Sequence, residues 1–350
     1  MKKYIRAIAV LAVVGITAFA NIQVNAQSTG LAINPRLDFS IRPGESQSAS
    51  FYLSNLNKEL PAKVQLNVTD FKASGETGIP SLITREDAPQ TPWSLKPFLD
   101  APKIVELEPG ESKYVPFTIK IPQGQGAGSY YSAVKYDPVL GDGSEAVVIS
   151  GAPTQLLFVT VPGKATELMN LEKFGTYELP DKQQVGKYKS LFVSSQPQRF
   201  AYTLKNAGNV AESPVGSIVI KNIFGKTVKT IEDANPGKNL ALIDQTRRFD
   251  VCITSETKEV KDGEKKEKVT SCKAPGLFPG VYKAQLSIFY GINGSSTQEI
   301  NTTSTFWYLP WWFIGVIVAI LAMLAFVIFK VRQNLIGVTS HRRDRKNKRK

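Results

Sequence analysis

The chain has 350 residues, with 43 lysines and arginines against 30 acidic residues and a net charge of +13. The excess lies at the ends: the first six residues carry three bases, the segment after residue 329 carries nine bases and one acid, and only +2 remains for residues 27–329. The central part therefore gives no basis for nucleic-acid binding. The only histidine, His341, is near the C-terminus, which excludes Ser–His and Cys–His catalysis upstream of the tail.

Residues 1–26 have the three parts of a secretory signal peptide. Lys2, Lys3 and Arg6 form a basic region, residues 7–20 are apolar, and Ala26 ends a small-residue cleavage site. An uncleaved anchor is the alternative, because the apolar segment has only about 14 residues. Either way, we expect the chain to enter a secretion route.

Residues 27–163 are expected to form an immunoglobulin-like β-sandwich. Apolar and polar residues alternate, as in half-buried strands, over 48–53, 62–68, 114–121 and 129–136. A longer apolar run, 146–161, contains Gly151 and Pro153, so it is either two strands or one strand with a bulge. Glycine and proline turns separate these segments, and no window keeps a helical period.

Two segments of this domain resemble each other. Residues 39–46 and 105–112 both end in Pro-Gly-Glu-Ser, and each leads into an alternating strand. We interpret each as a strand, a turn and a second strand, which is one hairpin module used twice. Chance similarity of turn chemistry is the alternative, and we infer no duplication.

Residues 73–102 interrupt the alternation with several prolines and glycines. A loop this long is either functional or fixed by its own apolar residues. Trp93 and Phe98 are the apolar side chains expected to fix it against one end of the sandwich. The alternative is that they contact a ligand, so they are the candidate binding-loop residues.

Residues 164–305, after a linker at 162–164, are expected to form a second immunoglobulin-like sandwich. The predicted strands are 200–206, 216–222, 227–231, 280–290 and 297–305. Few residues separate the last strand from the apolar segment that follows. This domain is therefore expected next to the membrane.

Cys252 and Cys272 are the only cysteines, and in a secreted chain they are expected to form a disulfide. Lys261-Asp262-Gly263 predicts a three-residue hairpin loop midway between them, which would place the two cysteines opposite each other. Two free thiols are the alternative. A metal site would need more ligands than these two residues supply, and the turn carboxylates of Asp137, Asp142 and Glu145 do not match a known calcium loop. No metal or cofactor is expected.

Residues 306–330 are predicted to be a transmembrane helix. No charge occurs between Phe306 and Phe329, and the 20 residues from Pro310 also lack amides, which is enough helix to span a bilayer. A buried core helix is the alternative, but it would rarely lack a polar face over this length. The expected interface residues are Trp307, Tyr308, Trp311 and Trp312 before the apolar core and Lys330 and Arg332 after it. The basic tail, 331–350, places the C-terminus in the cytoplasm and the domains outside.

The first domain also resembles a known family. The segment from Leu37 to Asn55, with Pro43-Gly44-Glu45-Ser46, and the segment from Ala101 to Pro122, with Pro109-Gly110-Glu111-Ser112, resemble the first ectodomain of the WxL-interacting proteins. That resemblance implies a Gram-positive cell-surface protein with two immunoglobulin-like domains, a transmembrane helix and a basic tail. It implies peptidoglycan binding by the first domain and partner binding by the second.

These observations predict a non-catalytic, membrane-anchored surface scaffold for adhesion. Its partners would be the membrane, spanned once, and either peptidoglycan or a surface protein, and the first domain would bind through loop 73–102. The alternative is a chaperone-like assembly factor for secreted surface proteins. A glycosidase-like enzyme would need a pair of carboxylates, and no pattern indicates one.

Overall fold

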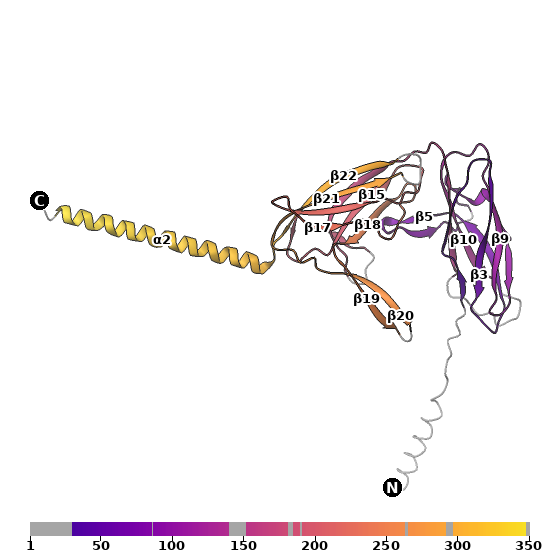
Figure 1. The fold of residues 1–350 in the computed structure, drawn as a ribbon, viewed down its shortest axis with the longest axis horizontal. Helices are drawn as coiled ribbons and strands as arrows, with labels where there is room; N and C mark the ends of the chain where they lie inside the picture. Colours follow the sequence, from indigo (N-terminus) through magenta and orange to yellow (C-terminus); the bar gives the residue numbers. More distant parts are fainter. Residues whose placement is uncertain are drawn as a thin grey trace, which may run out of the picture.

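The computed structural model describes residues 30–85, 87–139, 152–180, 185–189, 191–262, 265–291 and 297–347. Figure 1 shows two β-sandwiches, followed by the helix α2 (Trp311–Asn347). This arrangement confirms the predicted fold class of two immunoglobulin-like sandwiches and a C-terminal apolar helix. The predicted signal peptide lies outside the described residues.

The first sandwich packs a four-stranded sheet against a five-stranded sheet. The first sheet has the order β1 (Leu31–Ile33), β3 (Ser46–Asn55), β9 (Ser112–Lys120) and β7 (Leu99–Asp100). The second has the order β2 (Arg36–Ser40), β11 (Thr154–Val161), β10 (Gly128–Pro138), β4 (Ala62–Thr69) and β8 (Ile104–Leu107). Alternate side chains fill the space between them; Phe51 stacks on Phe117 with ring centroids 4.0 Å apart and meets Tyr136 of the other sheet edge-on.

The second sandwich repeats this plan. Its four-stranded sheet has the order β13 (Lys187–Tyr188), β12 (Met169–Glu178), β15 (Arg199–Asn206) and β18 (Thr246–Cys252). Its five-stranded sheet has the order β14 (Phe192–Val193), β22 (Gln298–Tyr308), β21 (Gly280–Tyr290), β16 (Val215–Asn222) and β17 (Thr227–Ile231). In both sandwiches a short early strand lies parallel to the last strand, β2 on β11 and β14 on β22. The two domains therefore share one topology apart from the short edge strands β7 and β13, which lie on opposite edges of the four-stranded sheets.

The interpretation of the Pro-Gly segments as hairpins is wrong. β2 pairs with β11 whereas β3 pairs with β1 and β9, so the turn at Gly44 carries the chain from one sheet to the other. The turn at Gly110 does the same between β8 and β9. Both glycines have a left-handed backbone, with φ of 83° and 70°. Similar turn chemistry here serves a crossing between sheets, because strand pairing is decided by partners distant in sequence.

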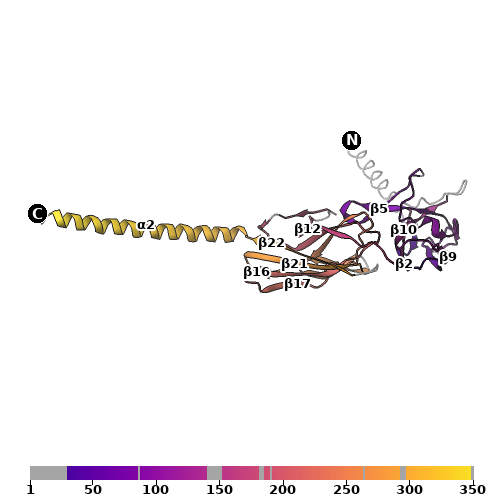
Figure 2. The same ribbon diagram turned by 90° about the horizontal axis from the view of Figure 1, so that it is seen from above.

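Residues 71–102 are also more ordered than an irregular loop. They contain the hairpin β5 (Phe71–Ser74) and β6 (Ile79–Leu82), joined by the 3-10 turn η1 (Gly75–Thr77), then η2 (Lys96–Phe98) and β7. We call residues 71–82 the junction hairpin, because it extends from the first sandwich to the second (Figures 1 and 2).

A buried apolar cluster joins the two sandwiches. Four of its residues come from the first domain (Phe71, Tyr131, Ala133, Phe158) and three from the second (Ala211, Leu240, Leu242). Two backbone contacts cross beside it: Ser129 N–H donates to the carbonyl of Asn209 at 2.9 Å, and Ala211 N–H donates to Ser129 Oγ at 2.9 Å. The linker at 162–164 is therefore supplemented by a shared core.

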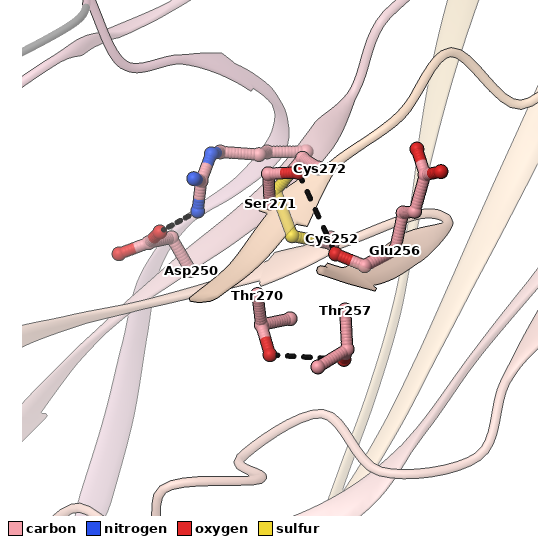
Figure 3. Close-up of a disulfide and its surroundings, with 8 residues drawn as sticks. Asp250, Cys252, Glu256, Thr257, Thr270, Ser271 and Cys272 are labelled. Atoms are coloured by element: carbon pink, nitrogen blue, oxygen red, sulfur yellow. Dashed lines mark hydrogen bonds and ion pairs between the residues drawn. A yellow bond between two sulfur atoms is a disulfide. The ribbon is translucent and has the colours of Figure 1, made fainter. Parts of the chain in front are cut away.

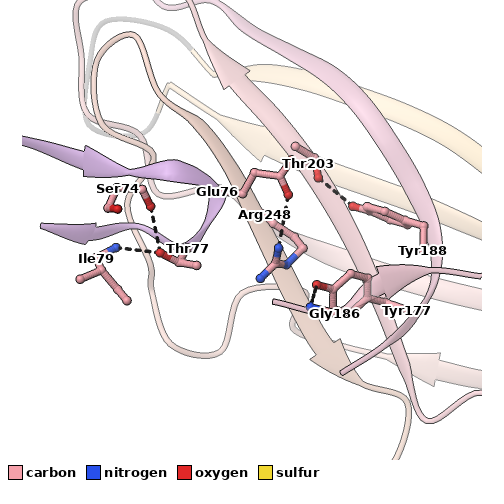
Figure 4. Close-up of polar contacts among 9 residues, drawn as sticks. All are labelled: Ser74, Glu76, Thr77, Ile79, Tyr177, Gly186, Tyr188, Thr203 and Arg248. Atoms are coloured by element: carbon pink, nitrogen blue, oxygen red, sulfur yellow. Dashed lines mark hydrogen bonds and ion pairs between the residues drawn. The ribbon is translucent and has the colours of Figure 1, made fainter. Parts of the chain in front are cut away.

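The junction hairpin adds a charged contact to this core. η1 lies against β18, and Glu76 Oε2 accepts a hydrogen bond from Arg248 Nη1 at 3.3 Å (Figure 4). The Arg248 side chain is almost fully buried and also lies over the ring of Tyr177 at 4.9 Å. A hairpin of the first domain thus supplies the carboxylate for a buried cation of the second.

Candidate functional site

Trp93 and Phe98, the expected binding-loop residues, are both packed. Trp93 is part-buried and stacks on Tyr131 with centroids 5.8 Å apart, beside the interdomain cluster. Phe98 meets Tyr130 edge-on at 5.7 Å and packs on the core of the first sandwich. The structure thus favours packing over ligand contact for both rings.

Asp70 fixes the segment that carries Trp93, a role that no pattern in the sequence indicated. Its carboxylate accepts hydrogen bonds from Ser94 Oγ at 2.7 Å, from Ser132 Oγ at 3.1 Å and from the backbone N–H of Thr91 at 3.1 Å. Residues 73–102 therefore belong to the interdomain junction and to the core and are held by their own apolar residues, as expected; a ligand-binding role for them stays a prediction.

The outer face of β3 and β9 is a better candidate for a binding surface. The side chains that point outward here are mostly serine, threonine and tyrosine, and the register places them in facing pairs. We call this set the Ser/Tyr face: Ser46, Ser48, Ser50, Tyr52, Ser54, Ser112, Tyr114, Pro116 and Thr118. Charge enters only at the end, where Lys120 pairs with Asp100.

Tyr52 and Tyr114 stand opposite each other at the centre of the Ser/Tyr face. Their ring centroids are 5.4 Å apart with planes tilted by 54°, and Tyr114 is 71% exposed. The Tyr52 hydroxyl donates to Ser112 Oγ, which donates to Ser54 Oγ at 2.8 Å. Hydrogen bonding to Ser112 lowers the pKa of the Tyr52 phenol below its usual value. The face therefore offers aromatic surface surrounded by groups that both donate and accept hydrogen bonds.

This face lies on the far side of the first domain from the helix. The second domain docks on the outer side of the other sheet, where Tyr131 and Ala133 of β10 and Phe158 of β11 enter the interdomain cluster. β9 accordingly lies at the opposite end of the molecule from α2 in both views (Figures 1 and 2). The alternation SQSASFYLSN already carried the signal, because every outward residue in it is a serine or a tyrosine.

The disulfide between Cys252 and Cys272 is confirmed, with Cα atoms 5.1 Å apart (Figure 3). The predicted register is wrong: β19 (Ser255–Asp262) and β20 (Lys265–Cys272) place Cys272 opposite Ser255. Cys252 instead ends β18, so the bridge ties the hairpin to the sandwich across two intervening residues. Gly263, the last residue of the predicted hairpin loop, lies outside the described residues.

The predicted membrane-interface residues fall into two groups. β22 continues through Tyr308, so Trp307 and Tyr308 belong to the second sandwich, and the Tyr308 ring is buried in its core. Trp311 and Trp312 begin α2 and are exposed, as are Lys330 and Arg332 near the end of its apolar part. Within the segment Trp311–Arg332 a window of 18 residues has a mean hydropathy of 2.9, and the segment is long enough to cross a membrane. The helix therefore begins five residues later than expected.

No cluster of three histidine, cysteine or acidic residues suited to a metal occurs in the described part of the chain. Asp137, one of the turn carboxylates, pairs with Lys135 at 2.5 Å and accepts from Asn67 Nδ2 at 2.8 Å. Asp142 and Glu145 lie outside the described residues.

No family model matches this chain, and no curated protein matches its sequence. Among solved structures, it is similar to the class 5 fimbriae chaperone CfaA, with 12% identity over 80% of this chain and 100% of that one and a TM-score of 0.35. It is also similar to a chaperone–tip adhesin complex of CFA/I fimbriae, with 16% identity over 71% of this chain and 100% of that one and a TM-score of 0.34. A third similar structure is the E. coli chaperone DraB, with 12% identity over 78% of this chain and 98% of that one and a TM-score of 0.31. The resemblance to WxL-interacting proteins stays a prediction.

Proposed function

We propose that this protein is a non-catalytic scaffold, anchored in the cell membrane with both sandwiches outside. We further propose that its Ser/Tyr face holds a neutral glycan of the cell wall. The observation that carries the proposal is the facing pair of Tyr52 and Tyr114 in an uncharged, hydroxyl-rich sheet surface. Tyrosine rings supply flat apolar area, and serine hydroxyls complement sugar hydroxyls because each can donate and accept.

The position of the Ser/Tyr face supports its role. The shared core at the junction couples the two sandwiches, and only Leu309 and Pro310 separate β22 from α2. An anchor in the membrane would thus hold the first domain away from the lipid, with the Ser/Tyr face outermost. The basic tail after Lys330 supports a cytoplasmic C-terminus.

Cosedimentation with purified cell-wall sacculi would test the ligand. The full chain in detergent micelles should pellet with the sacculi, and Tyr114→Ala should weaken binding about tenfold, since a central aromatic contact is worth at least ~1.4 kcal/mol. Ile104→Ala is the matched control, because it truncates an exposed apolar side chain on the other sheet of the same domain. Equal binding by Tyr114→Ala and wild type would refute the assignment of the face.

The competing function has its own outcome in the same experiment. If sacculi retain nothing, while secreted surface proteins bind and lose affinity with Tyr114→Ala, the face serves a chaperone-like assembly factor. Orientation is tested separately, by adding protease to intact cells or protoplasts. Degradation of both sandwiches should leave a small basic fragment, and protection of the sandwiches would contradict the proposed topology.

A further inference from the structure

Large apolar side chains stand exposed at the end of the second sandwich from which α2 begins. Phe224 is 89% exposed and Phe278 is 83% exposed, and Ile223 and Phe192 are also more than half exposed. We call Phe192, Ile223, Phe224 and Phe278 the collar. They come from three separate loops or strands, so this end is apolar in several places at once.

Strand register places the collar at one level. Asn222, the last residue of β16, pairs with Tyr282 near the start of β21, and Gly280 at that start pairs with Tyr308 at the end of β22. The β16–β17 turn, which carries Phe224, therefore lies at the same end of the sheet as the last residues of β22. Phe192 pairs with Trp307, and their rings meet at 5.3 Å. The first helical residue, Trp311, follows Tyr308 by three positions, which is within about 10 Å along a strand. Every member of the collar therefore lies near the base of the helix.

The collar loops satisfy their own backbone groups. Asn222 Oδ1 accepts the N–H groups of Phe224 and Lys226 at 3.1 and 3.0 Å, and Gly225 N–H donates to the Asn222 carbonyl at 2.9 Å. Beside the second loop, the Tyr282 hydroxyl donates to the carbonyl of Phe278 at 2.7 Å. Phe224 can therefore leave water with its backbone N–H paired, and Phe278 with its carbonyl paired.

Positive charge surrounds the collar. Lys221 and Lys226 flank Ile223 and Phe224 in the sequence, and Lys283 faces Lys221 across the β16–β21 pair. None of the three makes an ion pair with a residue that the structure describes. Lysines beside exposed aromatic rings fit an anionic lipid surface, which attracts the charge while the rings enter the interfacial layer.

We propose that the collar inserts into the outer leaflet around the base of α2, with Lys221, Lys226 and Lys283 on anionic headgroups. The inference rests on the proposed membrane anchor. It adds a second attachment, which fixes the tilt of the second sandwich and hence, through the shared junction core, the direction in which the Ser/Tyr face points. A single helix would leave that direction free.

Spin labels on the full chain in vesicles of phosphatidylcholine and phosphatidylglycerol test this inference. A label at Phe224→Cys should lie about 5–10 Å below the headgroup boundary, measured by its collisions with oxygen against an aqueous nickel complex. Val215→Cys, at the other end of β16 from the turn that carries Phe224, is the matched control and should stay in water. The oxidised Cys252–Cys272 pair does not react with the label.

Lipid charge and the lysines provide a second comparison. Replacing Lys221, Lys226 and Lys283 with glutamine should lower the ratio of inserted to non-inserted collar in anionic vesicles roughly fivefold for each lysine, and should change it little in pure phosphatidylcholine. If the label at 224 is as accessible to the aqueous nickel complex as the label at 215, the proposal is wrong. Spin–spin broadening at 224 with low access to both reagents would also overturn it, because it would indicate a contact between two copies.

The anchor is checked in the same vesicles with a label at Leu321→Cys, in the middle of the apolar helix. If this label is in lipid and the 224 label is not, only the collar is wrong. If neither is in lipid, both the anchor and the collar are wrong.

Discussion

Leu242 offers a direct test of the shared core between the sandwiches. It belongs to the interdomain cluster, is only 4% exposed, and lies on a segment of the second domain outside the two sheets. Leu242→Ala should remove about 3 kcal/mol of coupling, within the range for buried leucines. Because each 1.4 kcal/mol is tenfold, local opening of the junction should become about 100-fold more frequent.

Hydrogen exchange measures this opening at two amides whose hydrogen bonds cross the junction. Ser129 N–H and Ala211 N–H donate across it, so both should exchange up to about 100-fold faster in Leu242→Ala. Leu204→Ala is the matched control, because Leu204 is a fully buried leucine in the core of the second sandwich. It should destabilise that sandwich while affecting the junction amides less. If the two variants speed exchange equally at both places, the junction is not a separate cooperative contact.

Three further predictions concern other parts of the chain. Gly128→Ala should reproduce the Leu242→Ala exchange pattern, since a Cβ there would meet the carbonyl oxygen of Asn209 at 2.7 Å. Replacing Cys252 and Cys272 with serine should cost about 3 kcal/mol, measured by denaturant unfolding, and loosen the β19–β20 hairpin without unfolding the first domain. Burial raises the pKa of Glu212 from 4.5 to about 7. The contribution of Glu212 to the free energy of unfolding is therefore fully present below pH 4.5 and is lost as the pH rises through about 7. Glu212→Gln should remove this dependence, and a melting curve that keeps it would assign the titration elsewhere.

Several features followed from the sequence because their physics is local. Apolar–polar alternation identified the central strands β3, β4, β9, β10, β15, β16 and β21, since a half-buried strand needs two different faces. An uncharged run as long as a bilayer is thick identified α2. The Cys252–Cys272 disulfide followed from there being only two cysteines in a chain expected to be secreted.

What the sequence could not decide was which surfaces meet. The same Pro-Gly-Glu-Ser turn could close a hairpin or cross between sheets, and only the distant partners of β2 and β8 chose crossing. Loop 73–102 was expected to close one end of the first sandwich, because nothing local shows that the second domain packs beside Trp93 and Glu76. Alternation placed the outward serines and tyrosines of β3 on one face, but the docking of the second domain on the other sheet left that face exposed. A local pattern determines which side of a strand is apolar, whereas contacts between distant segments determine which surface stays open for a ligand.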